Sequence, residues 1–159
     1  MMKFNLKSLV FIGMAFFAAC NNKQKSAENK QESLLVFPTG DKITNNNFTG
    51  TAYLKPLIPA DSLNTTQVGN VTFEPGARSN WHLHPAGQIL LVIDGVGYYQ
   101  EKGQARITLR KGDVIKCPAN VEHWHGASPD TAFVQVAITN TKNGAPIWLQ
   151  PVSDEEYRK

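Results

Sequence analysis

Cysteine is scarce in this sequence, with two in 159 residues. Cys20 directly follows a short apolar segment and Cys117 lies just before Pro118, so we do not expect a disulfide between them. A chain well above about 100 residues can bury an adequate core without such a crosslink. We interpret Cys117 as a small buried apolar residue. Its closeness to His123 in the sequence leaves redox or metal chemistry as the alternative.

The sequence also lacks a large charge of either sign. The formal net charge is +3, from 16 basic and 13 acidic residues. Lys3 and Lys7 belong to a segment that we expect to be removed, and subtracting them leaves 14 basic against 13 acidic residues. A nearly neutral protein has no general attraction for nucleic acid or for acidic lipid headgroups. We therefore expect no nucleic-acid partner.

The N-terminal apolar run is too short to span a membrane. Leu9 to Phe17 falls well below the roughly 20 residues that a membrane helix needs. A basic start and an ending in Ala18-Ala19-Cys20 make residues 1–19 resemble a bacterial lipoprotein signal peptide, with Cys20 as the lipidated residue. An ordinary cleaved signal or an uncleaved anchor is the alternative. The lipid would hold the protein on the periplasmic side of a bacterial membrane.

Residues 20–33 consist mostly of Asn, Lys, Gln, Glu and Ser, so we predict a flexible tether there. Residues 34–159 form the predicted folded domain, in which short β-rich runs are separated by turn residues and no long helical period occurs. The predicted strands are 34–37, 50–54, 67–73, 81–84, 87–93, 97–101, 105–109, 113–117, 122–126 and 132–139. This pattern is typical of an all-β sandwich or barrel. The Ser153 to Glu156 spacing matches a capping box and predicts a short terminal helix.

The four histidines fall into two pairs. Side chains on a strand alternate between its faces, so His82 and His84 share one face, and so do His123 and His125. A lone histidine on a strand usually forms only a hydrogen bond. Two same-face pairs with Gln88 nearby instead predict a site for one divalent metal ion.

The spacing around these residues resembles the two motifs of the cupin superfamily. The first segment reads Gly76-x5-His82-x-His84-x3-Gln88-x6-Gly95, and the second reads Gly112-x5-Pro118-x-Asn120-x2-His123. The resemblance implies a single-domain jelly-roll barrel, also called a double-stranded β-helix, with His82, His84, Gln88 and His123 as the metal ligands. Three positions depart from the usual motifs: Gln88 replaces Glu, Asn120 replaces Gly, and Ala127 replaces Asn. Asn tolerates the left-handed backbone, so we expect the turn at Asn120 to survive.

A closer resemblance covers most of residues 48–157. It includes Phe48 to Thr51, Val71 to Arg78, Trp81 to Gln88, Gly112 to Val114, His123 to Ala127, and Trp148 to Tyr157. These segments are similar to small bacterial cupins that include the manganese-dependent hydroxynitrile lyases, which also use Gln as the third ligand. The resemblance implies manganese, with iron or zinc as alternatives, and a homo-oligomer. Those lyases carry a further active-site histidine where this chain has Gln135.

Three neutral imidazoles and a carboxamide would leave the metal its full positive charge, which suits it to polarise a carbonyl or an alkoxide. His125 lies about 7 Å along the strand from His123, so we predict it as the general acid or base. A supporting or core histidine is the alternative. We expect Val71, Phe73 and Gln135 to line the substrate pocket.

The sequence thus predicts a metal-dependent lyase that acts on a small polar molecule, with cyanohydrin cleavage implied by the resemblance. An iron-dependent oxygenase is one alternative, although neutral ligands should disfavour dioxygen activation. A lipid-anchored binding protein without turnover is another, and Gln135 in place of the lyase histidine favours it.

Overall fold

The computed structural model describes residues 35–159, and the predicted signal peptide, Cys20 and the tether lie outside that range. The described part of the chain folds into twelve β-strands and one short helix, α2 (Asp154–Arg158). The strands are β1 (Asp41–Lys42), β2 (Phe48–Thr49), β3 (Ala52–Ile58), β4 (Thr66–Phe73), β5 (Arg78–Ser79), β6 (His82–Leu83), β7 (Gln88–Glu101), β8 (Ile107–Arg110), β9 (Val114–Cys117), β10 (His123–Ala127), β11 (Phe133–Asn140) and β12 (Ile147–Trp148). None of these residues forms a helix long and apolar enough to cross a membrane.

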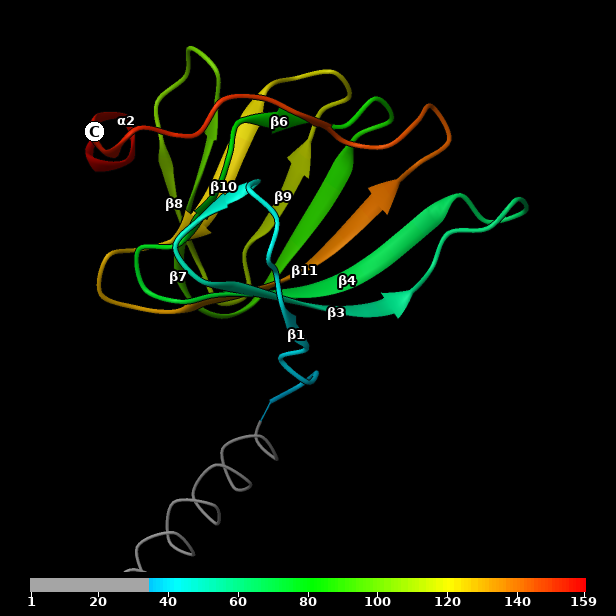
Figure 1. The fold of residues 1–159 in the computed structure, drawn as a ribbon, viewed down its shortest axis with the longest axis horizontal. Helices are drawn as coiled ribbons and strands as arrows, with labels where there is room; N and C mark the ends of the chain where they lie inside the picture. The colour runs from blue at the N-terminus through cyan, green and yellow to red at the C-terminus, as the bar shows by residue number, and fades with distance from the viewer. Residues whose placement is uncertain (1–34) are drawn as a thin grey trace, which may run out of the picture. The chain divides into compact units, whose positions relative to one another are not determined.

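The strands form a curled antiparallel jelly roll with two halves (Figure 1). One half holds β1, β3, β4, β11 and β9, and the other holds β8, β10, β5, β2, β6 and β12. The long strand β7 belongs to both. Its first part pairs with β11 and β9, and its second part pairs with β10 and β8. The predicted all-β jelly-roll fold is therefore confirmed.

A bend in β7 carries the chain from one half to the other. Val134 pairs with Asp94 and Gln135 pairs with Val92, so β7 has one extra residue at this point. Gly95 follows with φ +78°, and a side chain there would overlap the carbonyl oxygen of Ala132. The sequence predicted two strands separated by a turn at Asp94-Gly95. That prediction is wrong, because the glycine bends the strand without ending it.

Other predicted strands differ at their ends. Residues 35–37 form no strand, and β3 continues to Ile58, beyond the predicted end at residue 54. Pro56 is tolerated in β3 because β1 pairs only with Tyr53 and Leu54, so no strand requires the missing N–H at Pro56 on that side. The strands β1, β2, β5 and β12 were not predicted, since two residues show no alternation.

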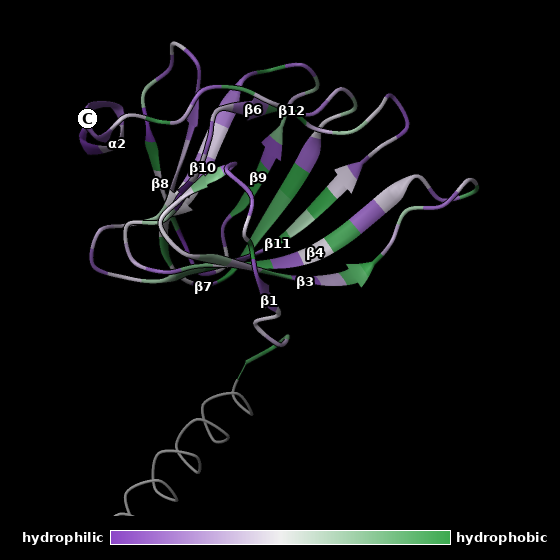
Figure 2. Ribbon diagram, in the orientation of Figure 1, coloured by the Kyte–Doolittle hydropathy of each residue, from purple (hydrophilic) through white to green (hydrophobic). Residues whose placement is uncertain are grey.

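Two apolar clusters hold the fold together. Phe73, Leu90 and Phe133 belong to the larger cluster, which fills the space between the two halves. Trp81, Trp124 and other residues form the smaller one, which the C-terminal segment covers. Figure 2 shows bands of apolar and polar residues along β4 and β11 that do not alternate strictly, because β11 buries the polar Gln135 and Thr139 as well as Phe133. In the other half, the histidines of β6 and β10 are buried and face the interior.

Candidate metal centre and pocket

The histidine cluster is assembled by strand pairing. In the register of β6 and β10, His82 lies opposite His123, and their ring centroids are 4.4 Å apart. The ring of His84 is 5.1 Å from that of His82, and the ring of His125 is 5.2 Å from it. Gln88 opens β7. All five side chains are buried, as a shared face requires.

One ring nitrogen from each of His82, His123 and His125 lies within 4.8 Å of the others, a spacing that could hold a metal ion. This trio differs from the predicted nitrogen ligands, since it contains His125 in place of His84. The ring of His84 is nevertheless close, at 5.6 Å from that of His123. The geometry brings all four histidines together, and distance alone does not separate ligand from acid or base.

Backbone carbonyls orient two of the rings. Nδ1 of His82 lies 2.9 Å from the carbonyl oxygen of Asn80, and Nδ1 of His123 lies 2.9 Å from that of Val121. A carbonyl oxygen only accepts, so each neutral ring carries its hydrogen on Nδ1 and keeps a lone pair on Nε2. Contacts of this kind fix the orientation of metal-binding histidines.

Burial keeps the rings uncharged. It lowers the pKa of His84 to about 4, with a smaller contribution from the repulsion of His123. The pKa values of His82 and His125 are also lowered well below the usual value, first by burial and then by neighbouring histidines. Burial lowers the pKa of His123 too, although the contact with Val121 opposes the change. Metal ions bind neutral imidazole, so the cluster is ready to bind without losing protons near pH 7.

Gln88 is held at both ends of its amide. Its Nε2 donates to Thr139 Oγ1 at 2.9 Å, and its Oε1 lies 3.9 Å from the sulfur of Cys117. Burial raises the pKa of Cys117 to about 12, so the side chain stays a thiol. A buried thiol is a poor metal ligand and a poor nucleophile. Cys117 therefore packs against a predicted ligand as a neutral group.

The three residues predicted to line the pocket lie in two different places. Val71 lines the cavity beside His125. Phe73 and Gln135 lie behind His125 and are fully buried: the Phe73 ring meets it edge-on at 5.7 Å, and Gln135 Nε2 lies 2.9 Å from its Nδ1. These two residues contact the ring of His125 and do not line the cavity.

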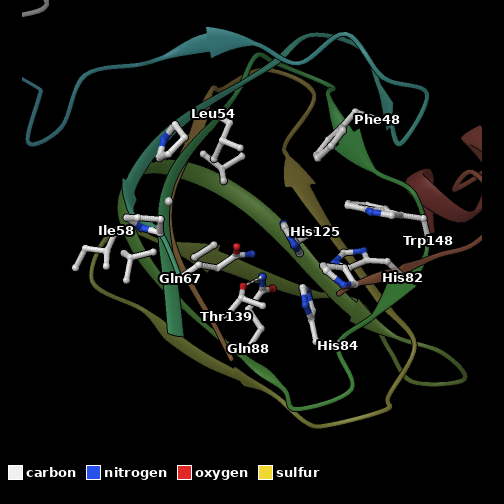
Figure 3. Close-up of a pocket in the computed structure, with 17 residues that line it drawn as sticks. Phe48, Leu54, Ile58, Gln67, His82, His84, Gln88, His125, Thr139 and Trp148 are labelled. Carbon is white, nitrogen blue, oxygen red and sulfur yellow. Dashed lines mark hydrogen bonds between the residues drawn. The ribbon is translucent and has the colours of Figure 1, made fainter. Parts of the chain in front are cut away.

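The cavity has a volume of about 310 Å³ and opens beside the histidines (Figure 3). Its base carries His82, His84, Gln88 and His125, while its outer wall is largely apolar. Sequence reasoning missed most of that wall, which consists of Phe48, Leu54, Pro56, Ile58, Pro59, Gln67, Val68, Gly69, Ala137, Thr139, Pro146 and Trp148. No local pattern marks these residues, because long-range pairing brings them together.

Trp148 connects the apolar wall of the cavity to the histidine cluster. Its strand β12 pairs with β6, so Trp148 lies opposite His82. The two ring centroids are 4.7 Å apart at 30°. Phe48 lies against the same indole at 5.5 Å. The apolar wall thus reaches a predicted ligand directly.

Several buried nitrogens of the cluster are available to bind a ligand. Among residues 35–159, four of these nitrogens have no hydrogen-bond partner: Nε2 of His123, Nε2 of His125 and both ring nitrogens of His84. Buried polar atoms without partners are costly unless a ligand or metal completes them. The residues present therefore fit a divalent metal ion. Fold and site together define an all-β barrel with a buried histidine cluster that could hold a metal.

Comparisons with known proteins place this barrel in a family. The cupin domain model matches residues 69–138. A protein named (R)-mandelonitrile lyase, from Granulicella tundricola, is 42% identical over 113 residues, which cover 70% of this chain and 86% of that protein. The chain belongs to the cupin superfamily, as its motifs predicted.

Two further relatives extend the comparison. A crystal structure of a cupin-like protein from Thermotoga maritima matches with a TM-score of 0.74 and 46% identity, covering 78% of this chain and 95% of the other. A protein named acireductone dioxygenase, from Alcanivorax borkumensis, is 27% identical over 66 residues, which cover 40% of this chain and 36% of that protein. The second match is confined to part of each chain.

Proposed function

We propose that this protein is a metal-dependent lyase that cleaves a carbon–carbon bond next to a hydroxyl group, with a cyanohydrin as the model substrate. The observation that carries the proposal is a cluster of buried neutral histidines at the base of an apolar cavity. The similarity to a protein named (R)-mandelonitrile lyase supports the choice of reaction. In this reaction the hydroxyl proton is removed, the bond to the nitrile carbon breaks, and an aldehyde and hydrogen cyanide leave.

The proposed ligands of one divalent ion, most simply manganese, are His82, His84, Gln88 and His123. When bound, the ion would polarise the substrate oxygen. Asn80 and Val121 hold two of the ligand rings in place through their carbonyl groups. The apolar wall, which includes Val71 and Trp148, receives the body of the substrate and excludes water.

His125 is the proposed group for handling the proton. Its ring lines the cavity, and its Nε2 has no hydrogen-bond partner in the described chain. Burial and its histidine neighbours keep the ring neutral by lowering its pKa. A proton can therefore be held or passed at Nε2, which is the ring nitrogen not engaged by the protein.

The test combines metal content with product release. Protein incubated separately with manganese, iron and zinc, then dialysed, is analysed by elemental mass spectrometry and assayed for cyanide release from mandelonitrile and an aliphatic cyanohydrin. We expect about one bound ion per chain, lost in His123→Ala. His125→Ala should keep the ion and lose roughly 100-fold or more in rate. A change at the exposed Gln104, to Ala, serves as the control. A loaded protein that releases no cyanide from either substrate contradicts the proposal.

An iron-dependent oxygenase is the second candidate, because the chain also resembles part of a protein named acireductone dioxygenase. Uniformly neutral ligands favour the lyase, since they leave the metal electrophilic and raise its reduction potential. Oxygen uptake that requires added Fe(II) and a substrate would reverse this ranking. Ligand binding without any product would instead favour a binding protein, the role that Gln135 in place of the lyase histidine supports.

We also propose that Cys20 is lipidated and anchors the protein on the periplasmic side of a bacterial membrane. The support is the order of basic, apolar and small residues before that cysteine. Cys20→Ser should move the protein from the membrane fraction to the soluble fraction. Unchanged fractionation would contradict the anchor.

A further inference from the structure

His125 is held differently from the histidines beside it. His82 and His123 contact backbone carbonyl oxygens through Nδ1, which places their hydrogen on that atom. Nδ1 of His125 instead lies 2.9 Å from the amide nitrogen of Gln135. An amide nitrogen only donates, so Nδ1 of His125 must accept. The neutral ring then carries its hydrogen on Nε2, which is the opposite arrangement.

We infer that Gln135 is a positioning residue that fixes His125 as a hydrogen-bond donor facing the cavity. Gln135 is fully buried, and its backbone is paired on both sides, with Val71 of β4 and Val92 of β7. The edge-on ring of Phe73 packs against His125 at 88°. The backbone of Gln135 is thus fixed on both sides and the ring of His125 is packed. Of the Gln135 amide, Nε2 contacts His125, while Oε1 has no hydrogen-bond partner among residues 35–159.

This assignment distinguishes the metal ligands from the residue that handles the proton. The distances alone do not make that distinction. A ring with hydrogen on Nε2 has no lone pair there to give to a metal ion. His125 is therefore excluded from the trio within 4.8 Å. The third nitrogen must come from His84, whose ring nitrogens have no partners in the described chain. His125 instead offers N–H to an acceptor.

The ligand class follows from that N–H group. It suits a molecule with an acceptor atom beside the metal-binding group, such as a carbonyl oxygen or a nitrile nitrogen. This step rests on the proposed lyase activity, in which the N–H would stabilise the departing cyanide or the new carbonyl. With its hydrogen already on Nε2, His125 would handle the proton as an acid: it would pass that hydrogen to the departing cyanide and regain one from the substrate hydroxyl.

The test is the tautomer itself, observed by two-bond 15N NMR correlation on the 15N-labelled full chain, free of metal and then loaded with diamagnetic zinc. We expect His125 to show a pyrrole-type signal at Nε2 and a pyridine-type signal at Nδ1. His82 and His123 should show the reverse pattern and act as internal references. A pyrrole-type signal at Nδ1 of His125 overturns the inference.

Two variants extend the test. In Gln135→Glu the carboxylate can only accept, so the two signal types of His125 should exchange positions while those of His82 and His123 stay. In Gln135→Met the contact is lost, and both nitrogens of His125 should move to intermediate shifts. A Gln135→Glu protein that folds with His125 unchanged would overturn the inference, and if it does not fold the wild-type spectrum still decides. No cyanohydrin is used, so a failed lyase assay leaves this result intact.

Discussion

The neutral histidines of the pocket make the metal-free protein sensitive to acid. Burial lowers the pKa of His84 from 6.5 to about 4, so between these values the unfolded chain binds a proton that the folded chain does not. Stability from this residue is fully present above pH 6.5 and is lost as the pH falls toward 4. Each pH unit in that range costs about 1.4 kcal/mol.

Urea unfolding of the metal-free protein at pH 7.5, 6, 5 and 4 measures this loss. His84→Gln, which cannot take up the proton, should show a shallower decline. The buried histidines His82, His123 and His125 contribute in the same direction. A free energy of unfolding that stays constant from pH 7.5 to 4 would contradict the prediction.

Single residues were the scale at which sequence reasoning worked best. The alternation rule correctly separated the interior histidines from Trp81 and Trp124, which pack in the outer cluster. Asn120 has φ 61°, the left-handed backbone expected of it. The partner of His125 could not be foreseen, because the contact with Gln135 joins β10 to β11 across the interior.

At the scale of elements, the bend in β7 depends on Gly95. Gly95→Ala would place a methyl group against the Ala132 carbonyl, so we expect a loss of more than about 3 kcal/mol in unfolding free energy. Gly103 has nearly the same backbone angle, φ +79°, with open space around it. Gly103→Ala should cost only about 1 to 2 kcal/mol. Denaturant unfolding compares the two variants, and equal losses would show that the backbone angle alone matters.

The C-terminal segment fastens Trp148 over His82. The Tyr157 hydroxyl donates to the Ala127 carbonyl at 2.8 Å, and the Arg78 guanidinium lies 4.6 Å from the centre of the Tyr157 ring. Between Trp148 and α2, Leu149 N–H donates to the carbonyl of Trp81. Loosening α2 should therefore loosen the wall of the pocket.

Tyr157→Ala should cost about 3 to 5 kcal/mol, and Tyr157→Phe, which loses only the hydroxyl contact, about 1 kcal/mol. Hydrogen exchange should speed up at Leu149 in the alanine variant far more than in the phenylalanine variant. Exchange at Leu149 that is unchanged by Tyr157→Ala would mean that β12 is held independently of the helix.

The elements that the sequence predicted share a local signal. The capping box was confirmed, since Ser153 and Glu156 bond each other's backbone at the start of α2. The longer strands stand out as β-rich runs between turn residues, whereas β12 is two residues long and pairs with β6. Trp148 therefore enters the pocket through a contact that no local pattern reveals.

At the scale of the whole molecule, metal binding should stabilise the fold. The proposed ligands come from β6, β7, β10 and the turn after β6, and the unfolded chain does not hold them together. A metal ion at 100 times its dissociation constant should raise the unfolding free energy by about 2.7 kcal/mol.

Thermal unfolding with and without manganese measures the effect. His123→Ala should abolish it, while Gln104→Ala should leave it intact. A rise in melting temperature that persists in His123→Ala would place the binding site elsewhere on the protein.

The fold class was predictable because many short strands and spaced glycines leave few architectures. The shape of the cavity was not, because residues as distant as Phe48, Val71 and Trp148 meet there. Pairing between remote strands decides which side chains form such a wall.

Because β7 belongs to both halves of the barrel, it constrains the order in which the chain folds. Neither half can be completed before this strand is in place, because β8, β9, β10 and β11 all pair with it. Its contacts should therefore form early, and substitutions such as Leu90→Ala should mainly slow refolding. Substitutions in α2 at the far end of the chain should mainly speed unfolding. The strand that carries Gln88 would then also limit the rate at which the pocket forms during folding.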